Sequence, residues 1–274
     1  MGVLHIVATP IGNLEDVTLR ALRVLAEADL VLAEDTRRTR VLLQRHAVKA
    51  RPLSLHAHNE AARIERVLGV LDAGGSAALV SDAGTPILSD PGARLVDAAL
   101  QAGHAVTPIP GPSALLAALV VAGLPAERFT FLGFLPRRKG ARDALLASLR
   151  QRPETLVLFE SPRRLPTTLR QLADALGERP ACVARELTKL HEEVVRDTLG
   201  ALAERFADGA RGEVTVVVGG ALEVATDPAD LDADIRARLA AGETPRDVAA
   251  ALSRARGLPR RDVYARVLAL REER

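Results

Sequence analysis

Residues 77–100 read AALVSDAGTPILSDPGARLVDAAL: an apolar run, a loop and an amphipathic segment in direct succession. The run 77–80 is short enough for a buried strand, and the loop 81–92 is rich in Gly, Pro and Asp, which interrupt regular structure. Apolar residues then recur at helical spacing from Leu95 to Leu100. This stretch predicts a strand, a loop at its carboxyl end and a helix, the repeating unit of an α/β fold.

The same succession lies on both sides of this stretch. Apolar runs at 4–8, 29–33 and 105–109 predict three more strands, and a segment of helical periodicity follows each. The segment 34–40, EDTRRTR, is expected to be a polar loop that precedes a helix through 41–43. Strands and helices that alternate at this spacing favour a mostly parallel sheet with helices on both faces.

The pattern restarts near Leu124, which suggests a second α/β domain. Five strands are expected, at 129–134, 155–159, 181–185, 194–198 and 213–218. Helices fit 141–149, 165–176 and 199–206. The expected domains are residues 1–123, with the mostly parallel sheet, and residues 124–222; 274 residues suit two domains better than one.

The tail at 229–274 differs in character from the rest. Helices are expected at about 231–241, 245–256 and 260–271, the second with Thr244 as N-cap and Pro245 at its first position. From Arg236 to Arg271 there are nine Arg and three acidic residues. The tail resembles a basic helix-turn-helix module, and a solvated helical cap remains an equal alternative.

Composition sets further limits. Cys182 is the single cysteine, which excludes a disulfide framework, and no motif suggests a metal site. No apolar run approaches the length of a membrane span and the start lacks the features of a signal peptide, so a cytoplasmic protein is expected. Five Phe, one Tyr and no Trp are too few for a broad base-stacking platform.

Several common site motifs are absent from the sequence. There is no G-x-G pair, no P-loop, no H-E-x-x-H and no G-x-S-x-G, which argues against dinucleotide-binding, NTPase, zincin and α/β-hydrolase sites. Four loops at the carboxyl ends of predicted strands remain, at 9–14, 34–39, 81–92 and 109–114. Open α/β sheets bind ligands at this edge.

In these loops the sequence resembles the family of ribosomal RNA small-subunit methyltransferase I. The similar motifs are TPIGNLEDVTLRA, EDTRRT, SDAGTPILSDPG and PGPSA, followed by GFLPRRKGAR, LVLFESPRR, ARELTKLHEE and GEVTVVVGG. The resemblance covers about residues 4–220. Members of that family are 16S rRNA (cytidine-2′-O)-methyltransferases of the tetrapyrrole methylase superfamily, acting on the 30S small ribosomal subunit.

The resemblance implies two α/β domains of tetrapyrrole-methylase type with S-adenosyl-L-methionine in the cleft between them, a C-terminal helical domain, and a homodimer. The residues it assigns to the cofactor are Pro10, Asp82, Ala83, Gly84, Thr85, Ile87, Ser113, Ala114, Phe159, Glu160 and Leu187. Ser113 and Ala114 would lie at the start of a helix, whose free amides suit a carboxylate.

Methyl transfer to a ribose hydroxyl needs alignment, together with a base or a group that stabilises the alkoxide. Candidates are Glu160 and Lys189, then Asp35 and Glu192. An inter-domain network of salt bridges is an equally good interpretation of these residues.

Basic residues that could contact RNA phosphates are Arg37, Arg38, Arg137, Arg138, Lys139, Arg163 and Arg164. Phe134 could stack on a base, although burial is the favoured interpretation.

Two alternatives stay open. The first is a methylase of the same superfamily that acts on a tetrapyrrole or a protein; tetrapyrrole enzymes carry a G-x-G-x-G-D-like loop where this chain has TPIGNL. The second is a non-catalytic ribosome-binding module.

Overall fold

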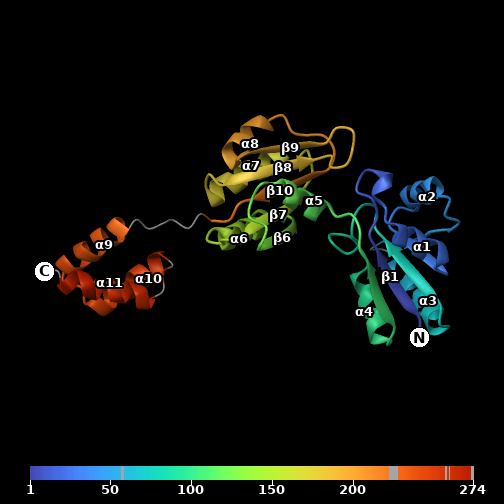
Figure 1. Ribbon diagram of the computed structural model, residues 1–274, viewed down its shortest axis with the longest axis horizontal. Helices are drawn as coiled ribbons and strands as arrows, with labels where there is room; N and C mark the ends of the chain where they lie inside the picture. The colour runs from blue at the N-terminus through green and yellow to red at the C-terminus, as the bar shows by residue number, and fades with distance from the viewer. Residues whose placement is uncertain (57–58, 222–227, 257, 259, 273–274) are drawn as a thin grey trace. The chain divides into compact units, whose positions relative to one another are not determined.

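Five short apolar segments form a parallel sheet near the N-terminus (Figure 1). The strands are β1 (Val3–Val7), β2 (Leu30–Ala33), β3 (Leu53–Ser54), β4 (Ser76–Val80) and β5 (Ala105–Ile109), in the order β3-β2-β4-β1-β5. Every neighbouring pair is parallel. The computed structural model describes residues 1–56, 59–221, 228–256, 258 and 260–272.

Alternate residues of the central strands enter two different cores. On β4, Ala77 and Leu79 pack with Leu71 and Leu95 of the helices on one face. Ala78 and Val80 pack with side chains of the helices on the other face. The helices of this region are α1 (Leu19–Glu27), α2 (Thr36–Arg45), α3 (Glu60–Asp72) and α4 (Ala93–Gln101), with a 3₁₀ turn at Leu14–Asp16. The predicted parallel sheet with helices on both faces is confirmed.

The second sheet is mixed. It contains β6 (Phe129–Phe134), β7 (Thr155–Glu160), β8 (Pro180–Arg185), β9 (Glu193–Thr198) and β10 (Val214–Val218), in the order β6-β7-β10-β8-β9. Only β6 and β7 pair in parallel; the other three pairings are antiparallel. Helices α6 (Lys139–Leu149), α7 (Leu165–Leu176) and α8 (Leu199–Arg205) accompany it.

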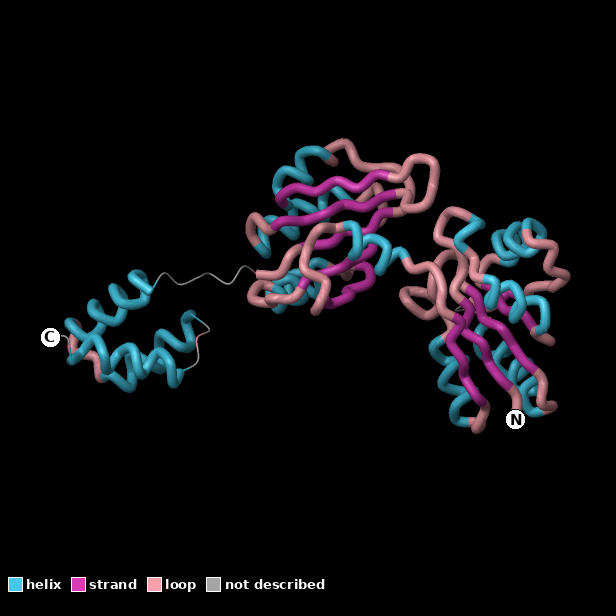
Figure 2. The backbone as a smooth tube through the Cα atoms, in the orientation of Figure 1, coloured by secondary structure: helices cyan, strands magenta, loops and turns pink. Residues whose placement is uncertain are grey.

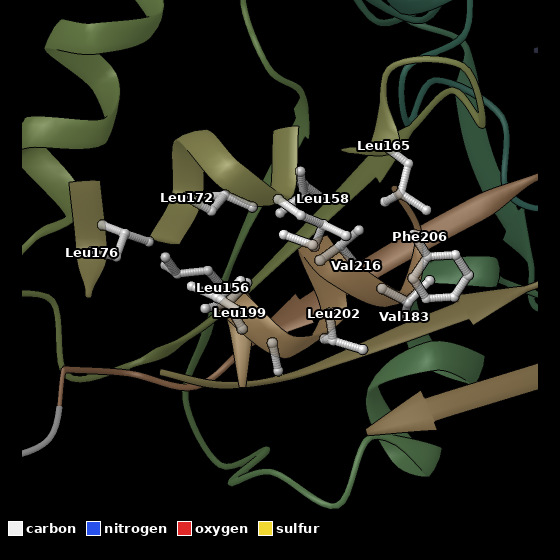
Figure 3. Packing of buried hydrophobic residues seen from close by; sticks show 14 of the residues in the cluster. Leu156, Leu158, Leu165, Leu172, Leu176, Val183, Leu199, Leu202, Phe206 and Val216 are labelled. Carbon is white, nitrogen blue, oxygen red and sulfur yellow. The ribbon is translucent and has the colours of Figure 1, made fainter. Parts of the chain in front are cut away.

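A leucine-rich cluster fills the space between this sheet and its helices (Figure 3). Leu158 and Val216 from the sheet meet Leu172 of α7 and Leu202 of α8, all fully buried. The opposite face is covered by α5 (Ala114–Val121), through Leu115, Ala118 and Leu119. Helix α5 precedes the boundary expected near Leu124, yet it packs on the second sheet. Periodicity could not show this, because α5 is apolar all round.

One local expectation was wrong, and one short strand was not predicted. The segment 34–40 is not a loop throughout, since α2 begins at Thr36 with Asp35 as its N-cap. The Asp35 carboxylate accepts a hydrogen bond from the Arg37 amide, which starts the helix among polar residues. The short strand β3 was also missed, because a two-residue strand carries no period.

The described residues from 228 onward form a second compact unit, which consists of helices (Figure 2). The described elements are α9 (Pro228–Ala240), α10 (Pro245–Arg256) and α11 (Arg260–Glu272), around a core that includes Ile235, Leu252 and Val267. Thr244 caps α10 as predicted: its hydroxyl oxygen accepts the Asp247 amide at 3.2 Å. The helix-turn-helix-like character of the tail stays a prediction, and parts of the expected range 229–274 lie outside the described residues. Within the described part of the chain, no helix is both long and apolar enough to cross a membrane.

Arg179 links the end of the second sheet to α6. The residue is 4% exposed. Its guanidinium donates to the carbonyls of Gly219 (3.3 Å), Leu149 (3.4 Å) and Arg150 (2.7 Å). Buried carbonyls without a donor are costly, so this one side chain fixes the ends of two elements.

We predict that Arg179→Ala lowers the free energy of unfolding by about 3 kcal/mol, since it leaves a cavity and three carbonyls without this donor. Urea titration followed by far-UV circular dichroism measures the change. Arg170→Ala, at an exposed position of α7, is the matched control. A loss for Arg179→Ala no larger than that of the control would contradict the role.

Candidate functional site

Two loops leave the first sheet side by side and are joined by their backbones. The Thr9 amide donates to the Gly84 carbonyl at 2.8 Å, and the Gly84 amide donates to the Thr9 carbonyl at 3.0 Å. The Thr9 hydroxyl donates to the Ser81 carbonyl at 3.1 Å, and the Ser81 hydroxyl donates to the Gly84 carbonyl, also at 3.1 Å. Gly84 has φ +81°, and a Cβ there would lie 3.3 Å from Ile11 Cγ2. The position therefore favours glycine.

The loop 81–92 is strained at two residues other than glycine. Ile87 and Ser89 have φ values of +77° and +72°. Residues in this region cost free energy and are retained where the surroundings fix them, most often at functional sites. The Thr85 hydroxyl donates to the Pro112 carbonyl at 3.4 Å, which ties this loop to the loop before α5.

Asp82 connects a third loop to the first two. Its Oδ1 accepts the Asp35 amide at 2.7 Å, and its Oδ2 lies 4.0 Å from Arg38 Nε. Asp35 itself is paired with Arg37, whose Nη2 lies 2.7 Å from Asp35 Oδ2. Hydrogen bonds from the Arg37 side chain and backbone hold the pKa of Asp35 well below its ordinary value. An ionised Asp35 engaged in this way is an N-cap and an ion-pair partner.

Two pockets lie at these loops. The larger pocket has a cavity volume of about 440 Å³ and is lined from both sheets. Its apolar wall includes Ala114, Phe159, Leu187 and Val214. The smaller pocket, of about 340 Å³, is lined mainly by the loop 9–14 and by α2.

Most of the residues assigned to the cofactor by resemblance line one or both pockets, and the others lie in the adjacent loops. Six of them line the larger pocket: Asp82, Ala83, Ala114, Phe159, Glu160 and Leu187. Pro10 lines the smaller pocket, as do Asp82 and Ala83. Gly84, Thr85, Ile87 and Ser113 line neither of these two pockets. Ser113 caps α5, its hydroxyl accepting the Leu116 amide at 3.5 Å. Their assignment to the cofactor stays a prediction.

Three carboxylates line the same wall of the larger pocket: Glu34, Asp82 and Asp90. Burial raises the pKa of Asp90 to about 6, and the negative charges of Glu34 and Asp82 add to the effect. Burial also raises the pKa of Glu34, again with a contribution from Asp82. Glu34 and Asp90 were not predicted as site residues, although both lie in the loops at 34–39 and 81–92. Their grouping depends on β2 and β4 being neighbours in the sheet.

Glu160 lies at the floor of the larger pocket with a side chain that is 0% exposed. Its Oε1 accepts the Ser161 amide at 2.7 Å, and its Oε2 accepts the Thr168 hydroxyl at 2.6 Å. Arg164 Nη2 lies 3.4 Å from Oε2. Both oxygens are engaged, so this geometry favours a positioning role for Glu160 over that of a free base.

Lys189 crosses the loop 9–14. Its ammonium lies 2.7 Å from Glu186 Oε1 and 3.2 Å from Glu213 Oε2. Burial lowers the pKa of Lys189, but the two carboxylates outweigh it and the pKa is raised. A cation that holds its proton can stabilise negative charge but is a poor base. Glu192 accepts the Thr188 amide at 2.6 Å, within the loop between β8 and β9 that also carries Lys189.

The residues expected to contact RNA are mostly exposed: Arg37, Arg38, Arg137, Arg138, Lys139 and Arg163. Arg164 differs, because it pairs with Glu160 and donates to the Leu135 carbonyl at 3.3 Å. The favoured interpretation of Phe134 as buried was wrong. It is 52% exposed and lines the larger pocket, with its ring centroid 5.9 Å from that of Phe159. Among the described residues, no group of three or more His, Cys, Asp or Glu is placed to hold a metal ion.

Comparison with known proteins places this fold and site in context. A family model described as tetrapyrrole (corrin/porphyrin) methylases matches residues 3–203. A Mesorhizobium japonicum protein named ribosomal RNA small subunit methyltransferase I is 47% identical over 272 residues, covering 98% of this chain and 92% of the relative. A Thermotoga maritima protein of the same name is 48% identical over 221 residues, covering 80% of this chain and 99% of the relative.

Solved structures of similar fold include a cobalt precorrin-4 methyltransferase, with a TM-score of 0.61 at 19% identity, covering 80% of this chain and 94% of that one. Uroporphyrin-III C-methyltransferase of Thermus thermophilus, complexed with S-adenosyl homocysteine, has a TM-score of 0.58 at 24% identity. That match covers 82% of this chain and all of the other. These likenesses establish the fold.

We predict that Asp90→Asn raises the melting temperature at pH 8 and leaves it nearly unchanged at pH 4. The folded-state pKa of about 6 lies above the ordinary value of 3.8 for an aspartate, so the stability gained from protonated Asp90 is lost as pH rises from about 4 through 6. Asparagine imitates the protonated form at every pH. Thermal melts at the two pH values measure the difference.

Asp97→Asn, which removes an exposed carboxylate of α4, is the control for the loss of one charge. An Asp90→Asn effect of equal size at pH 4 and pH 8 would show that burial of this carboxylate has no cost.

Proposed function

The chain belongs to the tetrapyrrole methylase family and, within it, to the ribosomal RNA small subunit methyltransferase I family, and on this premise we propose that it methylates ribosomal RNA. The proposed reaction transfers a methyl group from S-adenosyl-L-methionine to the 2′ oxygen of a decoding-centre cytidine in 16S rRNA, within the 30S subunit. The observation that carries the proposal is the larger pocket, because its chemistry suits this cofactor.

The fit rests on three features of the larger pocket. Phe159, Leu187 and Val214 give an apolar surface of the kind that accepts an adenine ring. Ala114 stands at the start of α5, where unpaired amides favour a carboxylate. Glu34, Asp82 and Asp90 supply negative charge opposite a ligand that carries a sulfonium and an ammonium. None of these features needs a glycine-rich phosphate loop, which agrees with its absence from the sequence.

When bound, the cofactor supplies an electrophilic methyl group on a positively charged sulfur. Methyl transfer would form the new O–C bond with an electron pair of the ribose oxygen, and the C–S electron pair would stay on sulfur. The hydroxyl proton leaves to a pocket carboxylate or to water. The residues of this chain contribute mainly by alignment and charge, since the donor is intrinsically reactive.

The three catalytic candidates take different parts in this scheme. The engaged carboxylate of Glu160 positions the turn between β7 and α7, at the end of the pocket. The ammonium of Lys189 stabilises negative charge on the ribose oxygen or on a phosphate. Asp35 holds the start of α2 and, through its amide, the side chain of Asp82. Direct proton removal would therefore fall to another carboxylate of the larger pocket or to water.

Exposed basic residues support an RNA substrate over a tetrapyrrole. Arg37 and Lys139 both have side chains that are 84% exposed, and Arg38 lies 60% exposed at the pocket rim. Phosphate contacts of this kind position RNA without reading its sequence. Such an enzyme would work in the cytoplasm, where ribosomal subunits are assembled.

A second copy of the chain is the proposed occupant of an exposed apolar surface, in a homodimer. On α5, Leu116 is 51% and Val120 is 75% exposed. We predict that the chain sediments at twice 29.1 kDa and that Leu116→Arg with Val120→Arg gives monomers. Wild-type chains that sediment as monomers at micromolar concentration would contradict the dimer.

The function is tested with tritiated S-adenosyl-L-methionine and three acceptors: 30S subunits that lack the modification, protein-free 16S rRNA, and a uroporphyrinogen. We predict label in the 30S subunits, at one cytidine, in a dinucleotide that resists alkaline cleavage because its 2′ oxygen is methylated. Ala114→Leu, which fills the larger pocket, should weaken cofactor binding in calorimetry at least about tenfold by loss of the cavity.

Ala102→Leu makes the same substitution at an exposed position outside the larger pocket and should bind the cofactor normally. Transfer to the uroporphyrinogen would favour a tetrapyrrole methylase, and label on a base nitrogen would refute ribose methylation. Absence of cofactor binding by the wild-type chain would favour a non-catalytic ribosome-binding module.

A further inference from the structure

The smaller pocket adjoins the larger one, which is the pocket proposed above to hold the cofactor. The two share a wall, whose residues are Ile11, Arg38, Asp82, Ala83 and Glu213. A ligand in the smaller pocket would therefore lie directly beside a ligand in the larger one. This adjacency is the arrangement that a transfer between two bound molecules requires.

The lining of the smaller pocket combines an apolar floor with polar edges. Pro10, Leu14, Val41 and Leu42 form apolar surface. The polar members Thr9, Thr39 and Ser81 donate their hydroxyl hydrogens to backbone carbonyls. Val41 is 55% exposed although apolar. A cavity volume of about 340 Å³ is at the low end for small-molecule sites and suits one nucleotide better than a macrocycle.

Two cations stand at this pocket. Arg38, on α2, is held near Asp82, with Nε 4.0 Å from Oδ2. Lys189 reaches it from the second sheet, across Gly12. A Cβ on Gly12 would lie 2.4 Å from Lys189 Cγ, so only glycine leaves room for this crossing. A guanidinium and an ammonium at the edge of a small cavity are suited to phosphate groups.

We propose that the smaller pocket receives the target nucleotide, extruded from the RNA, with its base on the floor formed by Val41 and Leu14, its ribose at the shared wall, and its phosphates at Arg38 and Lys189. Extrusion follows from the size of the pocket, because a nucleotide that is paired and stacked inside a helix cannot place its base and ribose in a cavity of about 340 Å³. The base is held by aliphatic contact, since no aromatic residue lines this pocket. The inference rests on the proposed function and identifies its substrate subsite.

Val41→Phe tests the subsite, because it narrows the cavity at an exposed position and should not disturb folding. Gln44→Phe, at an exposed position of the same helix that does not line the pocket, is the matched control. We predict that Val41→Phe slows single-turnover methyl transfer to 30S subunits about 100-fold through misplacement of the ribose. Its affinity for S-adenosyl-L-methionine should stay within twofold of wild type, as should both properties of Gln44→Phe.

A second readout does not depend on turnover. With the chain saturated by S-adenosyl homocysteine, so that the larger pocket is filled, cytidine 5′-monophosphate should give saturation-transfer NMR signals with wild type and Gln44→Phe. These signals should fall at least fivefold with Val41→Phe. Normal transfer by Val41→Phe, or equal nucleotide signals from all three proteins, would overturn the subsite and leave the proposed function intact. Failure of the wild-type chain to label 30S subunits would instead count against the function itself.

Discussion

The backbone pairing of Thr9 with Gly84 is the constraint on which both pockets depend. Strands β1 and β4 pair in parallel within the sheet. Beyond the ends of both strands, the loops that follow them are joined by one further bridge, between Thr9 and Gly84, which is antiparallel. Gly84 can take part because its φ of +81° costs glycine little. With the two loops joined, the residues that follow Thr9 line the smaller pocket, and Asp82 and Ala83 form a wall common to both pockets.

Asp82 connects the paired loops to α2 and to the larger pocket. By accepting the Asp35 amide it fixes the start of α2, and α2 in turn brings Arg38 to the shared wall. The same carboxylate adds to the negative potential that raises the pKa of Asp90. One side chain thus links the position of a cation to the charge of the pocket. The wall between the two pockets therefore carries both a positive charge, on Arg38, and a negative charge, on Asp82. We expect the cationic cofactor on one side of this wall and the anionic nucleotide on the other.

Much of this could be predicted from sequence, because the relevant signals are local. Strand β4 and its loop were recognised from an apolar run followed by Gly, Pro and Asp, and the loops gathered as the parallel topology requires. Features that depend on contacts distant in sequence could not be found in this way. The pairing of Lys189 with Glu213, the packing of α5 on the second sheet and the grouping of Glu34 with Asp90 arise only once the sheets have formed.

The most direct test of this account is a crystal structure of the chain with S-adenosyl homocysteine and cytidine 5′-monophosphate. The thioether sulfur is expected in the larger pocket, facing the wall formed by Arg38 and Asp82. The ribose of the nucleotide should lie across that wall in the smaller pocket, with O2′ directed at the sulfur. A homocysteine moiety seated in the smaller pocket, or a nucleotide bound away from the loop 9–14, would contradict it.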